Sequence, residues 1–356
     1  QMRYQVYAGA YTDKENQDGI FQLELDTEKE TLRIVRTYRE CDSPSFLAVT
    51  PDYLYAVSER EDSGEGMVSA YQRNRENGEL HFINSIVTRG TAMCHINVWP
   101  DGRYFSAANY MSGSVFTGAI REDGSLGGVC AFCQHESTGA GANPVRQDGP
   151  HVHCTQLSEN GRRLYVADLG LDRVFCYDIG KDASLTPAKE SAQIHLPAGE
   201  GPRHLVFRNQ GRFLYLTAEL GNKVFVYETK DGGETYENIQ TVSTLPDGNK
   251  GENTASDSHF SRDGRFLYVS NRGMDSIALY EADCAAGVLK EKGHYGAFGR
   301  CPRNFCVTPD NGYLLIANQE SGNIVLCKRN ADTGELCGKK DEIEMKRVAF
   351  VTVPQI

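Results

Sequence analysis

The stretch PRHLVFRNQGRFLYLTAELGNKVFVYE, residues 202–228, decides the fold. It contains an apolar run, a turn at Gly211, a second apolar run, a polar turn around Gly221 and a third run. The runs are short, rich in Val, Leu, Phe and Tyr, and separated by Gly or Asn turns. This pattern predicts β-strands joined by tight antiparallel hairpins.

The same frame recurs along the chain, which indicates a repeat architecture. It returns in residues 44–59, 94–119, 151–178, 256–281 and 302–329. Consecutive turn positions lie 47 to 59 residues apart; they are Asp52, Gly102, Gly161, Gly211, Gly264 and Asn311. A period of roughly 40–50 residues with about four strands per repeat is typical of the blades of a β-propeller.

A seventh copy is divided between the two ends of the chain. Residues 5–9 and 19–23 have the pattern of a second and a third strand, whereas Val348–Val353 follows a completed copy and has the pattern of a first strand. We therefore predict one all-β domain over residues 1–356, a seven-bladed propeller with four-stranded antiparallel blades. Residues 348–353 complete the N-terminal blade and close the ring without a covalent link.

The amino-acid composition limits the classes of binding partner and the cellular compartment that we expect for the protein. The 37 Lys and Arg against 48 Asp and Glu give a net charge of −11, which argues against nucleic acid and anionic membranes as partners. No apolar run is long enough to span a bilayer, and no signal-peptide pattern is visible. The 11 cysteines lack a framework spacing and predict reduced thiols in the cytoplasm. The pair Cys130 and Cys133 is interpreted as packing.

Polar residues recur at one place in the repeat. In the fifth copy, a hairpin centred on Gly211 returns Glu219 to the end of the sheet where Arg203 and His204 lie. The same arithmetic pairs His95 with Asn109, His153 with Asp168, Asp257 with Arg272, and Arg303-Asn304 with Gln319. We predict that these pairs, with Glu59 nearby, line a mouth at one end of the propeller axis.

Such a mouth suits a small anionic, oxygen-rich ligand, because Arg and His bind carboxylates and phosphates. The alternative is that these polar strand ends bind only one another and water. His151 and His153 project together from one strand, but no third metal ligand stands at a recognised spacing, so neither a metal nor another cofactor is expected. The Gly- and Pro-rich residues 135–150 are long for a blade connection and could form a lip over the mouth.

Five segments resemble the seven-bladed lactonase family. They are RQDGPHVH (146–153), ADLGLDRVF (167–175), GPRHLVFRNQGRFLYL (201–216), DGRFLYVSNRGMDSIALY (263–280) and PRNFCVTPDNGYLLIANQESGNIV (302–325). The family includes bacterial 6-phosphogluconolactonases of the cycloisomerase type and fungal 3-carboxy-cis,cis-muconate lactonizing enzymes. The resemblance covers essentially the whole chain. Ala218 and Ser256-Asp257 depart from the family pattern, which usually has Asn and Ala-Glu there.

The resemblance implies an axial catalytic site of His153 (or His151), Arg203, Glu219 and Arg272. Substrate-binding roles are expected for His151, His204, Asp257, Arg303, Asn304 and Gln319. The leading hypothesis is hydrolysis of a sugar lactone, 6-phospho-D-glucono-1,5-lactone, with Glu219 or His153 as the base that activates water and arginines that stabilise the oxyanion. The alternatives are lactonization of a carboxylated muconate and a propeller that binds a ligand or protein without catalysis.

Overall fold

The computed structural model describes residues 2–60, 65–137 and 139–355. Within them the strands form seven sheets, each with a path of four strands. This confirms the prediction of an all-β chain with seven four-stranded blades. The chain divides into two compact units, unit 1 (residues 1–56, 71–82 and 244–356) and unit 2 (residues 57–70 and 83–243).

Unit 1 contains three complete sheets. Their strands, in spatial order, are β29 (Val348–Thr352), β1 (Arg3–Ala10), β2 (Ile20–Asp26) and β3 (Thr31–Tyr38); β21 (Thr254–Phe260), β22 (Phe266–Arg272), β23 (Ser276–Ala282) and β24 (Leu289–Gly296); and β25 (Pro302–Val307), β26 (Tyr313–Asn318), β27 (Asn323–Arg329) and β28 (Leu336–Glu344).

Unit 2 also contains three complete sheets. Their strands are β8 (Met93–Val98), β9 (Tyr104–Asn109), β10 (Ser114–Ile120) and β11 (Leu126–Gln134); β12 (Val152–Leu157), β13 (Arg163–Asp168), β14 (Arg173–Ile179) and β15 (Leu185–Pro187); and β17 (Pro202–Arg208), β18 (Phe213–Ala218), β19 (Lys223–Glu228) and β20 (Glu237–Ser243). A short β16 (Ile194–His195) also pairs with β14, and two 3₁₀ turns, η1 (Lys181–Ala183) and η2 (Glu190–Ala192), lie between these strands.

The remaining sheet has the order β4 (Leu47–Val49), β5 (Tyr53–Ser58), β6 (Glu65–Arg73) and β7 (Leu80–Arg89). No helix among the described residues is long and apolar enough to cross a membrane.

The turns predicted from the repeat have the backbone conformation that their residues favour. Gly211 joins β17 to β18 with φ +83°, and Asn311 joins β25 to β26 with φ +63°. Glycine has no Cβ to clash in this left-handed region, and asparagine is among the residues that tolerate it best. These turns fix where each hairpin reverses, and hence which residues return to the same end of the sheet.

Burial follows the position of a strand within its sheet. All six residues of β18 are buried, whereas none of the seven residues of β20 is. A strand covered on both faces needs a continuous apolar run, while an outer strand needs none. In unit 2 the buried faces of the sheets that begin with β12 and β17 pack together, with Tyr165, Leu214 and Leu216 in the shared core.

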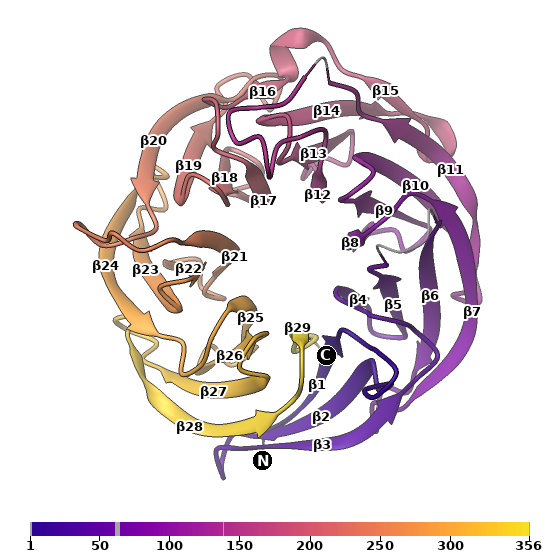
Figure 1. Cartoon of the computed structure of the whole chain (residues 1–356), viewed down its shortest axis with the longest axis vertical. Helices are drawn as coiled ribbons and strands as arrows, with labels where there is room; N and C mark the ends of the chain where they lie inside the picture. The colour runs from indigo at the N-terminus through magenta and orange to yellow at the C-terminus, as the bar shows by residue number, and fades with distance from the viewer. Residues whose placement is uncertain (1, 61–64, 138, 356) are drawn as a thin grey trace. The chain divides into compact units, whose positions relative to one another are not determined.

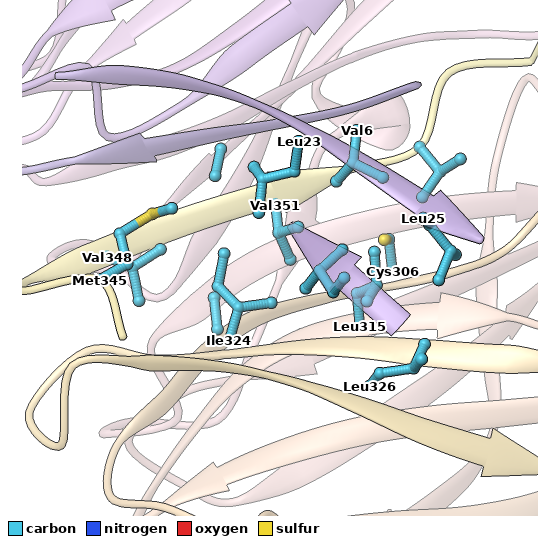
Figure 2. Close-up of a cluster of buried hydrophobic side chains, with 14 of the residues drawn as sticks. Val6, Leu23, Leu25, Cys306, Leu315, Ile324, Leu326, Met345, Val348 and Val351 are labelled. Atoms are coloured by element: carbon cyan, nitrogen blue, oxygen red, sulfur yellow. The ribbon is translucent and has the colours of Figure 1, made fainter. Parts of the chain in front are cut away.

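The C-terminal strand completes the N-terminal sheet, as predicted. Strand β29 pairs antiparallel with β1, with Ala8 opposite Val351 and Gly9 opposite Phe350, and it lies beside β1 in Figure 1. Figure 2 shows Val348 and Val351 of β29 near Leu23 of β2, in the same sheet, and near Leu315 of β26, in the sheet that begins with β25. Both valines are buried, so hydrogen bonds and apolar packing together hold the two ends of the chain.

The first strands of successive sheets lie side by side within each unit. In unit 2, β12 contacts both β8 and β17; in unit 1, β25 contacts both β21 and β29. Residues at the beginning of these strands are therefore brought together within their own unit.

Candidate active site

The pairing between the first and second strands of four sheets is irregular near the start of the first strand, where predicted site residues lie. In β17 the residues on either side of Arg203 pair with adjacent residues of β18, so Arg203 is the extra residue of a β-bulge. His153 in β12, Arg303 in β25 and Cys94 in β8 hold the same place. A bulge bends the strand and changes the direction of the side chain that it carries. These side chains therefore leave the alternation of their strands.

Glu219 follows β18 and lies at the end of the sheet where β17 begins. Its backbone N–H donates to the carbonyl oxygen of Gly201 at 2.8 Å, and Gln319 and Tyr110 make the equivalent bond in their own sheets at 2.8 and 2.9 Å. The strand arithmetic that placed Glu219 with Arg203 is thus confirmed. Tyr110 therefore occupies the same position in the sheet that begins with β8 as Glu219 does in the sheet that begins with β17.

Arg203 and Glu219 form a buried ion pair. Arg203 Nε donates to Glu219 Oε1 at 3.1 Å, and the two side chains are only 3% and 2% exposed. Burying two charges is costly, and their attraction compensates only when further hydrogen bonds satisfy the remaining polar atoms. Arg203 Nη1 also lies 3.3 Å from His204 Nε2, which places an imidazole beside the guanidinium.

A second guanidinium binds the same carboxylate. Arg146, on the loop between β11 and β12, donates from Nη2 to Glu219 Oε2 and to the hydroxyl oxygen of Tyr110, the latter at 3.0 Å. Burial works against the charge of Arg146, but Glu219 and Tyr110 outweigh it and raise the pKa of Arg146 above its usual value. Burial and the Glu219 charge also raise the pKa of Tyr110, which stays a neutral hydroxyl.

A row of rings lies next to these charges. The centroids of His95 and His204 are 5.8 Å apart, those of His204 and His153 5.4 Å, and those of His153 and Tyr110 5.5 Å. The ring of His151 stacks on the ring of Tyr110, with the two centroids 4.7 Å apart. The bulge residue His153 thus lies between Tyr110 and His204, close to the groups that bind Glu219.

His151 and Asp168 are occupied in supporting the strand ends. His151 Nδ1 donates to the backbone oxygen of Tyr110 at 2.9 Å, and its Nε2 lies 2.7 Å from Asp148 Oδ1. The fully buried Asp168 accepts the backbone N–H of His151 at 2.9 Å and lies 2.6 Å from His135 Nδ1. Between His151 and His153, the latter has the contacts expected of a site residue.

In unit 1, Asp257 and Asn304 bind each other. Asp257 Oδ2 accepts from Asn304 Nδ2 and lies next to His259 Nε2, both at 2.7 Å, while Asn304 Oδ1 accepts from the backbone N–H of Val351 at 2.8 Å. Both side chains are buried. These bonds connect β21, β25 and β29. The predicted substrate-binding role of Asp257 and Asn304 stays a prediction.

Arg272 and Asp257 lie at the same end of their sheet, where β21 begins and β22 ends. Arg272 is directly opposite Thr254, three residues before Asp257, and the pairing is irregular between Ala255 and Ser258. Arg272 Nη2 donates to the carbonyl oxygen of Ala255 at 3.2 Å.

Arg303 lies over an aromatic ring of the same unit. Its guanidinium carbon is 5.4 Å from the centroid of the Tyr11 ring, and the guanidinium carbon of Arg347 is 5.2 Å from the same centroid.

The predicted site residues are divided between the two units. Unit 1 contains Arg272, Asp257, Arg303, Asn304 and Gln319, and unit 2 contains His151, His153, Arg203, His204 and Glu219. That all of them line one mouth stays a prediction.

Across residues 2–60, 65–137 and 139–355, no three His, Cys, Asp or Glu side chains gather as the ligands of a metal ion would. The polar chemistry of unit 2 is instead that of two guanidiniums, one carboxylate, several imidazoles and a phenol. This set can bind an anion, donate hydrogen bonds to a developing oxyanion and exchange protons near neutral pH.

Two residues of this cluster were not predicted from the sequence. Arg146 belongs to the segment 146–153 that carries the family resemblance, and Tyr110 directly follows the predicted strand-end residue Asn109. Tyr110 occupies the position in its repeat that Glu219 occupies in the fifth repeat, and this correspondence could have identified Tyr110 as a site residue. Nothing local marks Arg146 as a partner of Glu219, since 73 residues separate them.

The sequence and the fold are similar to those of known proteins. Residues 5–353 match the family described as "Lactonase, 7-bladed beta-propeller". A 6-phosphogluconolactonase of Bacillus subtilis is 35% identical over 334 residues, which is 94% of this chain and 93% of the relative. The structure of a periplasmic gluconolactonase of Pseudomonas aeruginosa superposes with a TM-score of 0.92 at 30% identity and covers 99% of this chain and 100% of that one.

Proposed function

Because the chain belongs to the family of seven-bladed β-propeller lactonases, we propose that it hydrolyses 6-phospho-D-glucono-1,5-lactone to 6-phosphogluconate. The observation that carries the proposal is the buried Arg203–Glu219 pair beside His153 and His204. Family membership alone would support the reaction only by analogy with relatives, because one fold can carry many activities. The pair supplies charge and hydrogen-bond donors at a buried position.

The reaction adds water across one ester bond. A water oxygen attacks the lactone carbonyl carbon and loses a proton to a base, and the bond between that carbon and the ring oxygen breaks. The ring oxygen gains a proton and becomes a hydroxyl. The negative charge that develops on the carbonyl oxygen needs donors fixed in place beforehand, and one such donor is typically worth about 10²–10³ in rate.

His153 is the base in this proposal, and Arg203 stabilises the oxyanion. Glu219 accepts a guanidinium hydrogen bond on each oxygen, from Arg203 and from Arg146. Its role is to hold the two arginines. His153 lies between Tyr110 and His204, where an imidazole can exchange a proton with water.

The remaining predicted residues keep secondary roles in the proposal. His204, beside Arg203, is a substrate-binding group, as are Arg303, Gln319 and His151. Arg272 is a further cation for the substrate. Asp257 and Asn304 are the least favoured as substrate ligands, because they bind each other and Val351. The cytoplasmic location and a small anionic substrate remain part of this proposal.

A second candidate substrate is the unphosphorylated gluconolactone, because one close structural relative is described as a gluconolactonase. An assay coupled to oxidation of 6-phosphogluconate tests the first substrate, and a pH indicator in weak buffer tests the second. We expect turnover above the spontaneous rate, with Glu219→Gln reduced about 100-fold or more. If the protein hydrolyses neither lactone, the proposal fails; incubation with 3-carboxymuconate then tests the lactonizing alternative.

A further inference from the structure

The loop that carries Arg146 is held in shape by its own polar groups. Gln147 is fully buried; its Oε1 accepts from the N–H of Asn143 at 3.0 Å, and its Nε2 donates to the carbonyl oxygen of Leu169 at 2.9 Å. The N–H of Arg146 donates to Asn143 Oδ1 at 3.1 Å. The loop therefore presents Arg146 from a fixed backbone, and the side chain is placed in advance of any ligand.

The guanidinium of Arg146 has unused donors. A guanidinium carries five N–H groups. Its contacts with Tyr110 and Glu219 both use Nη2, and no other described residue accepts a bond from Nε or Nη1. The side chain is 38% exposed, against 3% for Arg203. A solute can therefore reach Arg146 more readily than Arg203.

Two guanidiniums and one carboxylate lie together in this cluster. Arg203 and Arg146 both donate to Glu219, each to one of its two oxygens. Arginine stays charged at every relevant pH, so the three groups sum to +1. A chain with a net charge of −11 therefore presents a local cation beside a buried reaction site.

We propose that Arg146 binds the phosphate group of the substrate and so selects a phosphorylated lactone over a neutral one. This inference rests on the proposed function. A phosphate monoester has three terminal oxygens on a tetrahedral phosphorus, and the planar guanidinium of arginine can bind two of them through paired N–H groups. In the lactone ring the carbonyl carbon and the carbon that bears the phosphorylated CH₂ group flank the same ring oxygen, so the carbonyl and the phosphate are a few bonds apart. Arg203 and Arg146 bind the two oxygens of one carboxylate, so a carbonyl at the buried Arg203 brings the phosphate towards the more exposed Arg146.

The test compares two substrates that share the reacting centre. We would measure kcat/KM of Arg146→Gln and Arg146→Lys with 6-phosphogluconolactone and with gluconolactone. For Arg146→Gln we expect a loss of about 10- to 100-fold on the phosphorylated lactone and a much smaller loss on the neutral one, because a charge-assisted hydrogen bond contributes only to the former. Arg146→Lys should retain part of the preference, since it keeps the charge without the paired donors.

Inorganic phosphate provides a second readout. It should inhibit the wild type competitively, and Arg146→Gln should raise its inhibition constant by a similar factor. The matched control is Arg162→Gln, which removes an exposed arginine of the β12–β13 turn and should change neither quantity.

Two results would overturn the inference. An equal loss on both lactones would mean that Arg146 only positions Glu219, and no loss on either would mean that it is not used at all. Both presuppose a wild type that hydrolyses at least one lactone. A wild type without activity on either would instead contradict the proposed function, so the two failures can be told apart.

Discussion

The side-chain oxygen of Asn304 accepts a hydrogen bond of 2.8 Å from the backbone N–H of Val351, 47 residues later in the chain. Asn304 also donates to Asp257, so one amide connects the strand that completes the N-terminal sheet to a buried carboxylate. Both Asn304 and Asp257 are buried, so the loss of either group would leave polar atoms unsatisfied away from water.

Asn304→Ala should therefore act on stability first. It removes two buried hydrogen bonds and leaves the Val351 N–H and one Asp257 interaction unsatisfied, at a cost of about 2–4 kcal/mol. Urea unfolding followed by circular dichroism measures this cost. Asn249→Ala, in an exposed loop, is the control. A variant of normal stability with lost lactonase activity would instead assign Asn304 to substrate binding.

Removal of residues 347–356 should prevent stable folding. The deletion strips β29 from β1 and exposes an unpaired strand edge, and it removes the buried side chains of Val348, Phe350, Val351 and Val353. At about 1.5–3 kcal/mol for each buried apolar side chain, the loss is on the order of the stability of a whole domain. We expect aggregation or a large fall in Tm, and no such effect when only residues 355–356 are removed. Unchanged melting of the longer deletion would contradict closure by β29.

The Arg203–Glu219 pair should show strong coupling. Glu219→Ala removes the carboxylate that the buried Arg203 guanidinium binds and should cost about 3 kcal/mol or more. Arg203→Ala should cost less, because Arg146 still binds Glu219. The double variant should cost less than the sum of the two, because the buried carboxylate and the buried guanidinium are removed together and only the half-buried Arg146 loses its contact with Glu219. All three should lower kcat/KM by at least about 100-fold. Additive effects on unfolding would mean that the pair is not formed in solution.

Alkaline pH should destabilise the protein. Burial raises the pKa of Cys306 and of Tyr268 to about 12, whereas the same groups titrate near pH 8.5 and 10 in an unfolded chain. The folded state holds these protons more tightly, so the stabilisation is complete below those unfolded values and is lost as pH rises towards 12. For Tyr268 the full effect is about 2–3 kcal/mol.

The measurement is the free energy of unfolding in urea between pH 7 and 11. Tyr268→Phe should flatten the decline above pH 10, whereas Cys337→Ser, at an exposed thiol, should leave it unchanged. A free energy of unfolding that stays constant up to pH 11 would contradict the predicted shifts.

The repeat determined the architecture because its signals are local. Glycine or asparagine stands at five of the six hairpin turns, and apolar runs form the second strands. These features fix where the chain reverses and which strands are covered on both faces, as Gly211 and β18 illustrate. The C-terminal strand could be recognised as well, since residues 348–353 had the pattern of a first strand without a blade. The same local signals placed Glu219 at the end of the sheet where Arg203 lies.

Only the tertiary structure decided which side chains meet. The bulges at His153, Arg203 and Arg303 change the direction of these side chains, and strand alternation assumes that no residue is inserted. Arg146 reaches Glu219 from a loop whose shape depends on Gln147 and Leu169. A hairpin turn is fixed by the residues next to it, whereas a contact between distant residues depends on the packing of every element between them, and no local pattern in the sequence encodes that.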